Sequence, residues 1–477
     1  MVASPQLKWL GLALLGAVQF MVVLDIAIVN VALPSIQTDL DFSQANLQWV
    51  ISAYALVFGG FLLLGGRTAD LLGRRRIFMA GLVVFTAGSL LCGLAWDEAS
   101  LIGARAIQGL GAATISPAAL AILMTTFNEG RERNIALGVW GAVGGFGAAA
   151  GVLLGGVLTD SLSWEWIFFV NIPVGIAALL LAPALLGETK HTREKTFDAA
   201  GAVLVTAGLS TLVLGITQGS EWGWSSGRTI GIFAASAALL AGFVAWEQRA
   251  AEPLMRFGLL RTKTVLGANV AGFILGTALF SMFLILTLYM QQVLGYSAMK
   301  TGVAYLAVAG TSIIWANVAA ALVGRVGVRP LIAGGMGILA VGMLLFTQAP
   351  VDGSYATHLL PGFLLVALGM ALCFVPISIA ALAGVKQAEA GIASGLINTS
   401  QQVGGAVGIA LLSTIAISHT EDEIAAGTAV PQAMTSGFQL AFWVGAAIAA
   451  AGVVAALALI RQDEIEATEA VVAPAAA

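Results

Sequence analysis

Two charged side chains, Asp25 and Arg105, stand inside long apolar stretches of the chain. A charge at the centre of an apolar helix in a bilayer costs about 2.5–3.5 kcal/mol on insertion scales, so each is expected to face a cavity or a partner. Removal from water favours the neutral form of a carboxyl group, whereas a nearby guanidinium favours the charged form. An aspartate whose contact with an arginine changes between conformations can therefore bind and release a proton.

These two residues have different expected roles. We predict that Asp25 carries a proton and that Arg105, which keeps its own proton, is its electrostatic partner or an organiser of the core. A static buried ion pair, or an arginine that caps backbone carbonyls, is the alternative.

A second group of charges lies in the segment from Gly66 to Arg76, which reads GRTADLLGRRR. Gly66 and Gly73 permit close approach of the backbone, and Asp70 stands among arginines that include Arg74. An ion pair of these two residues could hold two helix ends together and could also be broken when the helices move. Simple anchoring of a loop by positive charge is the competing interpretation.

Glycines recur along one apolar stretch with spacings that allow two helices to touch. They are Gly138, Gly147, Gly151, Gly155 and Gly156. The pattern predicts either plain packing or a seam along which two halves of the protein move.

Uncharged polar residues also lie inside apolar stretches. They are Asn30, Gln108, Asn269, Asn317, Asn398, Gln401 and Gln402. We expect about half to bond between helices. The others could line a wide cavity with aromatic residues, for which packing or lipid contact is the alternative. These aromatic candidates are Trp49, Tyr54, Phe280, Phe283, Tyr289 and Phe374.

The elements that must position these residues are membrane-spanning helices. The chain has 477 residues, of which 59% are hydrophobic and only 10% are charged, which leaves too little polar surface for a water-soluble domain. A bilayer core needs about 20 apolar residues per helix, and this length gives about fourteen spans. The spans lie near residues 9–34, 47–66, 77–95, 100–124, 134–158, 164–187, 198–218, 229–248, 264–292, 302–323, 330–348, 357–383, 392–418 and 437–460.

The loop charges support this count, because cytoplasmic loops collect Lys and Arg. With the N-terminus placed in the cytoplasm, every basic residue outside the spans falls on the cytoplasmic side except Arg228 and Lys300. A missed helix would invert every later loop and destroy this asymmetry. We therefore expect an all-α protein of the cytoplasmic membrane with both termini in the cytoplasm.

The sequence offers little to a cofactor, a metal or an enzyme. It has no GxxxxGK[ST] segment to hold the phosphates of ATP, so an ion gradient or a partner must drive any pumping. Cys92 and Cys373 lie in apolar runs, and the histidines are far apart, which disfavours a metal site. No Ser/His pairing lies in the spans, and no nucleic-acid partner is expected.

The spans form two groups of six separated by two further helices. The predicted divisions are a first bundle at 1–190, a two-helix insertion at 191–255, a second bundle at 256–462 and a disordered cytoplasmic tail at 463–477. The groups echo each other, as transporter halves often do: Gly73 follows the second helix of one group, and Gly327 follows that of the other. Chance recurrence is a competitor in a chain with 58 glycines.

These motifs, in this order and over nearly the whole length, resemble the fourteen-helix drug:proton antiporter family of the major facilitator superfamily, the EmrB/QacA type. The matching stretches are Leu24-Asp25 through Pro34, Gly66 to Arg76, Arg105 to Gly109, the glycines from Gly138 to Gly156, Trp164 to Gly175, and Asn398 to Gly405.

The resemblance implies a major facilitator fold, in which two six-helix bundles flank a central cavity, and transport by alternating access. It implies a monomer that exports lipophilic, often cationic compounds in exchange for protons. It also marks Asp25 and Arg105 as functional and places Asp70 with Arg74 in an inner gate.

Four positions depart from the family pattern, and one of them is Glu165, which stands where many relatives carry a basic residue. Leu71 stands where the gate turn often has Arg, and Ala27 where the first helix often has Thr. Val152 replaces the proline that usually follows the fifth-helix glycine, so its fixed φ and missing N–H are lost. This last change weakens the case for strict antiport more than the case for the fold.

Two other functions remain open from the sequence. Proton-coupled uptake of a metabolite would use the same fold in the opposite direction. A membrane sensor without transport would tolerate the loss of the Asp25 charge. The sequence does not identify the substrate, since a self-export pump of an antibiotic producer and a broad-range resistance pump would look alike.

Overall fold

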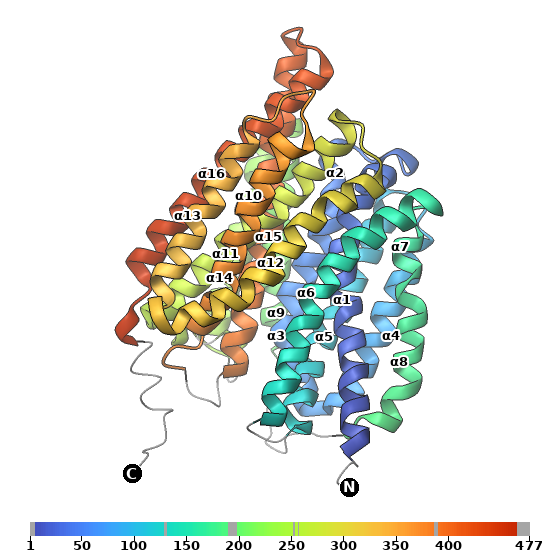
Figure 1. The fold of residues 1–477 in the computed structure, drawn as a ribbon, viewed down its shortest axis with the longest axis vertical. Coiled ribbons are helices and arrows are strands. Elements are labelled where there is room, and N and C mark those ends of the chain that lie inside the picture. The colour runs from blue at the N-terminus through green and yellow to red at the C-terminus, as the bar shows by residue number, and fades with distance from the viewer. Residues whose placement is uncertain are drawn as a thin grey trace. The chain divides into compact units, whose positions relative to one another are not determined.

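The computed structural model describes residues 5–127, 131–188, 198–250, 253–255, 257–385 and 390–464, and these ranges are helical without any strand (Figure 1). The first part of the chain forms α1 (Pro5–Asp39), α2 (Gln44–Leu47), α3 (Trp49–Leu72), α4 (Arg74–Gly93), α5 (Glu98–Thr126), α6 (Arg131–Ser161), α7 (Trp166–Phe169) and α8 (Asn171–Leu185). Two central helices follow, α9 (Ala199–Trp222) and α10 (Gly227–Glu247).

The last part forms the 3-10 turn η1 (Leu259–Arg261), α11 (Lys263–Leu288), the π-helical turn η2 (Tyr289–Val293), α12 (Ala298–Val326), α13 (Val328–Phe346), a second π-helical turn η3 (Tyr355–Leu359), α14 (Leu360–Ala380), α15 (Ala390–Ala425) and α16 (Val430–Leu459).

Each predicted span coincides with a helix, or in one case with the pair α7 and α8. Among the described residues, 12 helices are long and apolar enough to cross a bilayer, or up to 13 if the bent α12 counts as one span. The remaining predicted span corresponds to α6, which has 31 residues. Only its part Ala149–Ser161 counts as an apolar helix, and this part alone is shorter than a full span. The all-helical membrane fold is confirmed, while the count of fourteen stays a prediction.

Local sequence explains where several helices begin and end. Asp97 caps α5 by accepting a hydrogen bond of 2.7 Å from the Ser100 backbone N–H. This bond, with a second from the same residue, lowers the pKa of Asp97 below its ordinary value. Gly73 has φ +111 between α3 and α4, and Gly327 has φ +86 between α12 and α13, conformations that favour glycine. These two glycines are the ones that echo each other in sequence.

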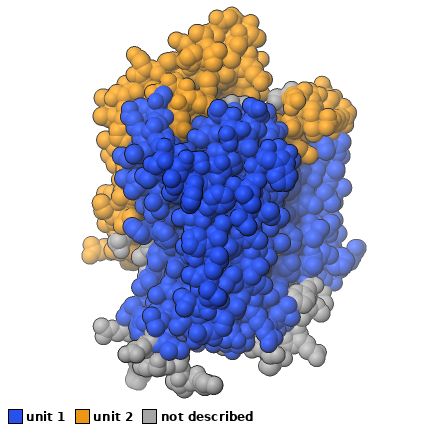
Figure 2. Space-filling view, turned by 90° about the vertical axis from the view of Figure 1, so that its right-hand side faces the viewer, with its two compact units in different colours: residues 1–212, 230–254, 295–306 blue, residues 213–229, 255–294, 307–477 orange. Residues whose placement is uncertain are grey.

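The chain divides into two compact units (Figure 2). Unit 1 comprises residues 1–212, 230–254 and 295–306, and unit 2 comprises 213–229, 255–294 and 307–477. In unit 1, α6 packs along α1, and α5 packs along both α3 and α4. In unit 2, α15 packs along α11, and α13 packs along α14 and α16. The fifth helix of each group of six thus packs on the first.

Glycines make this pairing close in unit 2. A Cβ on Gly404 of α15 would overlap the carbonyl oxygen of Phe273 on α11, and a Cβ on Gly276 of α11 would overlap that of Gln401. A Cβ on Gly408 would lie 2.6 Å from the Cα of Thr277. Small residues here let the two backbones touch, as helices in membranes require when no hydrophobic effect pulls them together.

Large apolar side chains are exposed on helices of both units, as a bilayer demands. Leu180 is 75% exposed, Val454 68% and Ile314 65%. In water such a surface would drive aggregation, but against lipid tails it needs no cover.

Three sequence predictions fall wholly or mostly outside the described residues. The division between 190 and 191 lies in the undescribed range 189–197, and most of the tail at 463–477 lies in 465–477. The side chain of Asn317, a candidate for a bond between helices, is also outside the description.

We predict that Gly404→Ala destabilises the protein by about 1–3 kcal/mol, because an added methyl group in a well-packed contact forces the backbones apart. The measurement is thermal unfolding of the purified protein in detergent. Gly310→Ala in α12 is the matched control, since a Cβ there meets nothing within 4 Å. Equal stability of Gly404→Ala and wild type would contradict the close contact between α11 and α15.

Candidate functional site

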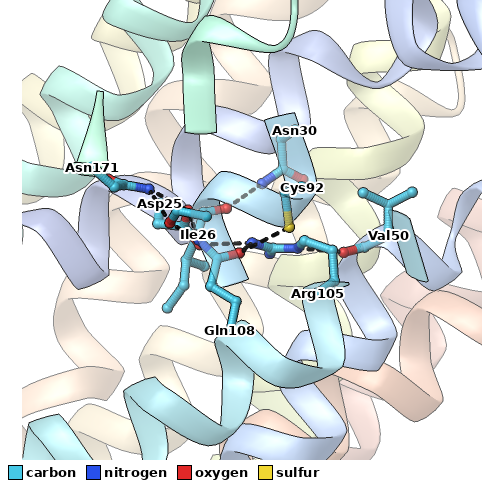
Figure 3. Close-up of polar contacts among 9 residues, drawn as sticks. Asp25, Ile26, Asn30, Val50, Cys92, Arg105, Gln108 and Asn171 are labelled. Carbon is cyan, nitrogen blue, oxygen red and sulfur yellow. Dashed lines mark hydrogen bonds and ion pairs between the residues drawn. The ribbon is translucent and has the colours of Figure 1, made fainter. Parts of the chain in front are cut away.

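Asp25 lies in the interior of unit 1 with no exposed surface. Its Oδ2 accepts a hydrogen bond of 2.7 Å from Arg105 Nη1. Its Oδ1 accepts 2.7 Å from Gln108 Nε2 and 2.8 Å from Asn171 Nδ2. Figure 3 shows the carboxylate between Asn171 on one side and Arg105 on the other. Every one of these partners is a donor, so the surroundings are matched to the ionised carboxylate.

Arg105 is 1% exposed and is held on several sides. Besides Asp25, it donates from Nε to the carbonyl oxygen of Val50 at 2.9 Å and from Nη1 to Gln108 Oε1 at 2.5 Å. Its guanidinium carbon lies 4.4 Å from the centre of the Tyr54 ring and 5.7 Å from that of Phe168. Carbonyl, amide and ring faces all favour a cation, so Arg105 keeps partners of suitable charge even without Asp25.

Gln108 connects the ion pair to α4. Its Nε2 also donates to Ser89 Oγ at 2.7 Å, and the Cys92 thiol approaches its Oε1 at 3.6 Å. Ser89 Oγ further accepts from Asn171 Nδ2 at 3.3 Å. Side chains from α1, α4, α5 and α8 therefore form one buried polar network in an otherwise apolar bundle.

The glycine-rich face of α6 fixes the part of α1 that bears Asp25. A Cβ on Gly151 would lie 2.9 Å from the carbonyl oxygen of Leu24, and one on Gly155 would lie 2.7 Å from that of Ile28. A Cβ on Gly147 would lie 3.2 Å from the carbonyl oxygen of Phe20. These contacts bracket Asp25 from both sides, so larger residues on α6 would displace it from Arg105.

Gly156 lies against the first turn of α12. A Cβ there would lie 2.6 Å from the carbonyl oxygen of Ala298. Beyond it, Asp160 accepts hydrogen bonds from the backbone N–H groups of Ala298 at 3.2 Å and Met299 at 2.8 Å. The predicted glycine pattern thus serves two different contacts, one with α1 and one with α12.

The turn around Gly73 contains the predicted charge pair. Arg74 donates from Nε and Nη2 to Asp70 Oδ1 at 2.9 and 2.7 Å, which joins the start of α4 to the end of α3. Its Nη1 reaches the carbonyl oxygen of Ala121 on α5 at 3.4 Å. A Cβ on Gly66 would lie 3.3 Å from Pro117, also on α5. The motif therefore ties three helix ends together within unit 1.

The cavity candidates of unit 1 lie in different surroundings. Tyr54 and Gln108 belong to the network around Asp25, and Trp49 is half-buried at the start of α3. Asn30 is buried and donates to the carbonyl oxygen of Ile26 within its own helix at 3.0 Å.

The candidates of unit 2 are likewise varied. Phe280 packs against Gly405, and Phe283 is half-buried on the same helix. Tyr289 is buried and donates to the carbonyl oxygen of Pro350 at 2.5 Å. Asn398 is exposed and bonds its own helix at Ser394, whereas Gln401 is half-buried. Their role in binding stays a prediction.

Sequence reasoning missed Asn171 and Ser89 as members of the site. Asn171 is separated from Asp25 by 146 positions, and Ser89 from Asn171 by 82. Ser89 had only the signal of a polar residue inside an apolar span, which it shares with many others. Asn171 also lies in the stretch from Trp164 to Gly175 that resembles the family, but the resemblance gave it no role.

Sequence reasoning also missed two buried acids at the ends of the two central helices. Asp198, directly before α9, is 4% exposed, and Glu247, the last residue of α10, is 3% exposed. Asp198 accepts a hydrogen bond from Trp246 Nε1 at 2.6 Å.

The fold and this site define a class of protein. The model of the family described as Major Facilitator Superfamily matches residues 15–409. The chain therefore belongs to this superfamily of transporters, and it is a multi-pass protein of the cell membrane and not an enzyme.

Two relatives are similar to this chain over most of its length. The puromycin resistance protein pur8 of Streptomyces alboniger is 41% identical over 433 residues, which cover 90% of this chain and 86% of that protein. The cephamycin export protein CmcT of Amycolatopsis lactamdurans is 42% identical over 414 residues, which cover 86% and 85%. These names agree with the resemblance to drug exporters. The crystal structure of peptide transporter POT in complex with sulfate has a TM-score of 0.69 at 16% identity over 95% of each chain, which supports the fold.

We predict that Arg105→Leu destabilises the protein by about 3–5 kcal/mol, because it leaves the Asp25 carboxylate buried without its countercharge. Asp25→Asn should cost less, since Arg105 retains Val50 and Gln108. The double variant should recover part of the loss. Thermal unfolding of the three purified variants checks this, and strictly additive effects would contradict a direct interaction between the two side chains.

Proposed function

We propose that the chain is a secondary active exporter that moves small amphipathic or cationic compounds out of the cell in exchange for protons. The single observation that carries the proposal is the carboxylate of Asp25, buried in the membrane bundle and balanced by the guanidinium of Arg105. Such a carboxylate is costly to keep in a membrane protein and marks a functional site.

The exchange follows from charge balance. While Asp25 is ionised, its bond to Arg105 satisfies both charges. A proton on Asp25 removes that attraction, and Arg105 then relies on Val50, Gln108 and the Tyr54 ring. Alternating access would expose Asp25 to each side of the membrane in turn. The gain or loss of the negative charge on Asp25 would then link the entry of a proton to the exit of a cation.

Other parts of the chain have supporting roles in this proposal. The cavity residues bind the substrate, and the ion pair of Asp70 and Arg74 acts as a gate that opens and closes. The glycines of α6 allow this helix to move against its neighbours while their backbones stay in contact. The proton gradient drives transport, and neither ATP nor another cofactor takes part. We also propose fourteen spans, both termini in the cytoplasm, the domain divisions given above, and a monomer.

The relatives suggest the kind of substrate. Their names refer to resistance to puromycin and export of cephamycin. These two antibiotics are therefore the first compounds to test on this chain, beside a simple lipophilic cation such as ethidium.

We predict that an imposed gradient of ethidium or puromycin drives protons across liposomes that contain the purified wild type. Asp25→Asn should reduce this flux to the level of protein-free liposomes, because asparagine cannot exchange a proton. A pH-sensitive dye inside the liposomes records the flux. The direction of substrate movement relative to the proton gradient distinguishes export by exchange from uptake.

The matched control is Asp352→Asn, the same substitution at an exposed residue between α13 and η3. It should leave the flux unchanged. Substrate movement without proton movement in the wild type would contradict antiport, and undiminished proton flux in Asp25→Asn would remove Asp25 from the proton path.

A further inference from the structure

Among the three side chains that donate a hydrogen bond to Asp25, Asn171 is the one with an unused acceptor. Asn171 is 1% exposed and begins α8 directly after the break at Val170. Its Nδ2 donates to Asp25 Oδ1 and Ser89 Oγ, but its Oδ1 is buried without a hydrogen-bond partner in the described part of the chain. A buried carbonyl oxygen without a donor is uncommon and calls for a reason.

The other two partners of Asp25 cannot serve as acceptors. Arg105 has only N–H groups. Gln108 is fixed in its orientation, since its Oε1 accepts from Arg105 and its Nε2 donates to Asp25 and Ser89. Reversing that amide would place N–H groups against the N–H groups of the guanidinium. Nothing comparable holds the free end of the Asn171 amide.

A protonated Asp25 needs a hydrogen-bond acceptor, and the amide oxygen of Asn171 can be that acceptor. When a proton binds Oδ1, the new O–H must donate to an acceptor, because a buried hydroxyl without one is unfavourable. Half a turn of the Asn171 amide about its last side-chain bond exchanges Nδ2 and Oδ1, which places an oxygen beside the new O–H. The Ser89 hydroxyl, which accepts from Nδ2 before the turn, can then donate to the same oxygen.

We propose that Asn171 is a positioning residue that reverses its side-chain amide each time Asp25 gains or loses a proton. It donates to the carboxylate and accepts from the carboxylic acid, so both forms of Asp25 keep a hydrogen bond in the interior. This inference rests on the proposed function, because it assigns Asn171 to the same proton-carrying site.

The reversal requires no chemistry beyond the transfer of one proton. The proton comes from water when the site is open and sits on Asp25 Oδ1, and only hydrogen bonds change. The charged and titratable groups that face this place are Arg105 from α5, Tyr54 from α3 and Cys92 from α4. The proton on Oδ1 removes the attraction between the two charges, but Oδ2 stays an oxygen to which Arg105 can donate a neutral hydrogen bond.

Infrared difference spectroscopy tests the reversal directly. The full-length protein is produced with asparagine carrying carbon-13 at the side-chain carbonyl, and spectra at acidic and neutral pH are subtracted. Asn171→Leu identifies the Asn171 carbonyl band by its loss, and Asn171→Thr serves if the leucine variant does not fold. We expect this band to shift when the carboxylic acid band of Asp25 appears, and to stay unshifted in Asp25→Asn.

Asn269 provides the internal control. It is also buried in a helix, but both ends of its amide are bonded, to the carbonyl oxygen of Val265 at 2.8 Å and the Ser400 hydroxyl at 2.9 Å. Its band, assigned with Asn269→Leu, should not move with pH.

Two results would overturn the inference in distinguishable ways. If the acid band of Asp25 appears while the Asn171 band stays in place, Asn171 is a fixed donor and proton carriage by Asp25 survives. If acid produces no Asp25 band at all, both the reversal and the proposed proton carrier fail.

Discussion

The buried pair of Asp25 and Arg105 is the interaction on which the rest of unit 1 depends. Two opposite charges can remain in an apolar bundle only if their geometry is close and their other lone pairs and protons are satisfied. The structure meets this demand with Gln108 and Asn171 at the carboxylate and with Val50 at the guanidinium. Four helices must therefore keep their relative positions for one ion pair to be tolerable.

Direct contact between helix backbones holds the helices in these relative positions more precisely than apolar side chains can. Leucines and valines pack against lipid as readily as against each other, so apolar side chains alone give little preference for one arrangement. Glycines on α6 remove the side chain altogether and bring its backbone against Leu24 and Ile28, the neighbours of Asp25. The same solution appears between α11 and α15, where Gly276 and Gly404 meet carbonyl groups.

Much of this could be predicted from the sequence because a bilayer imposes simple rules on length and charge. Each apolar stretch became a helix, and the rarity of charge inside them singled out Asp25 and Arg105. Asn171 and Ser89 were not predicted as site residues, because an uncharged polar side chain costs little free energy to insert into a bilayer and is therefore common there. Only the fold shows which distant partner such a side chain contacts. Tyr54 was predicted as cavity lining, yet its ring lies against a guanidinium, a contact that no local pattern encodes.

The cap that Asp160 places on α12 has a consequence for hydration. The first N–H groups of a helix have no partner within it, and here the carboxylate of α6 takes the place of water at Ala298 and Met299. If these two helix ends part, the N–H groups and the carboxylate must all be solvated at once. Separation is therefore favourable only where water can follow, so wetting of this end and opening of the contact are a single event.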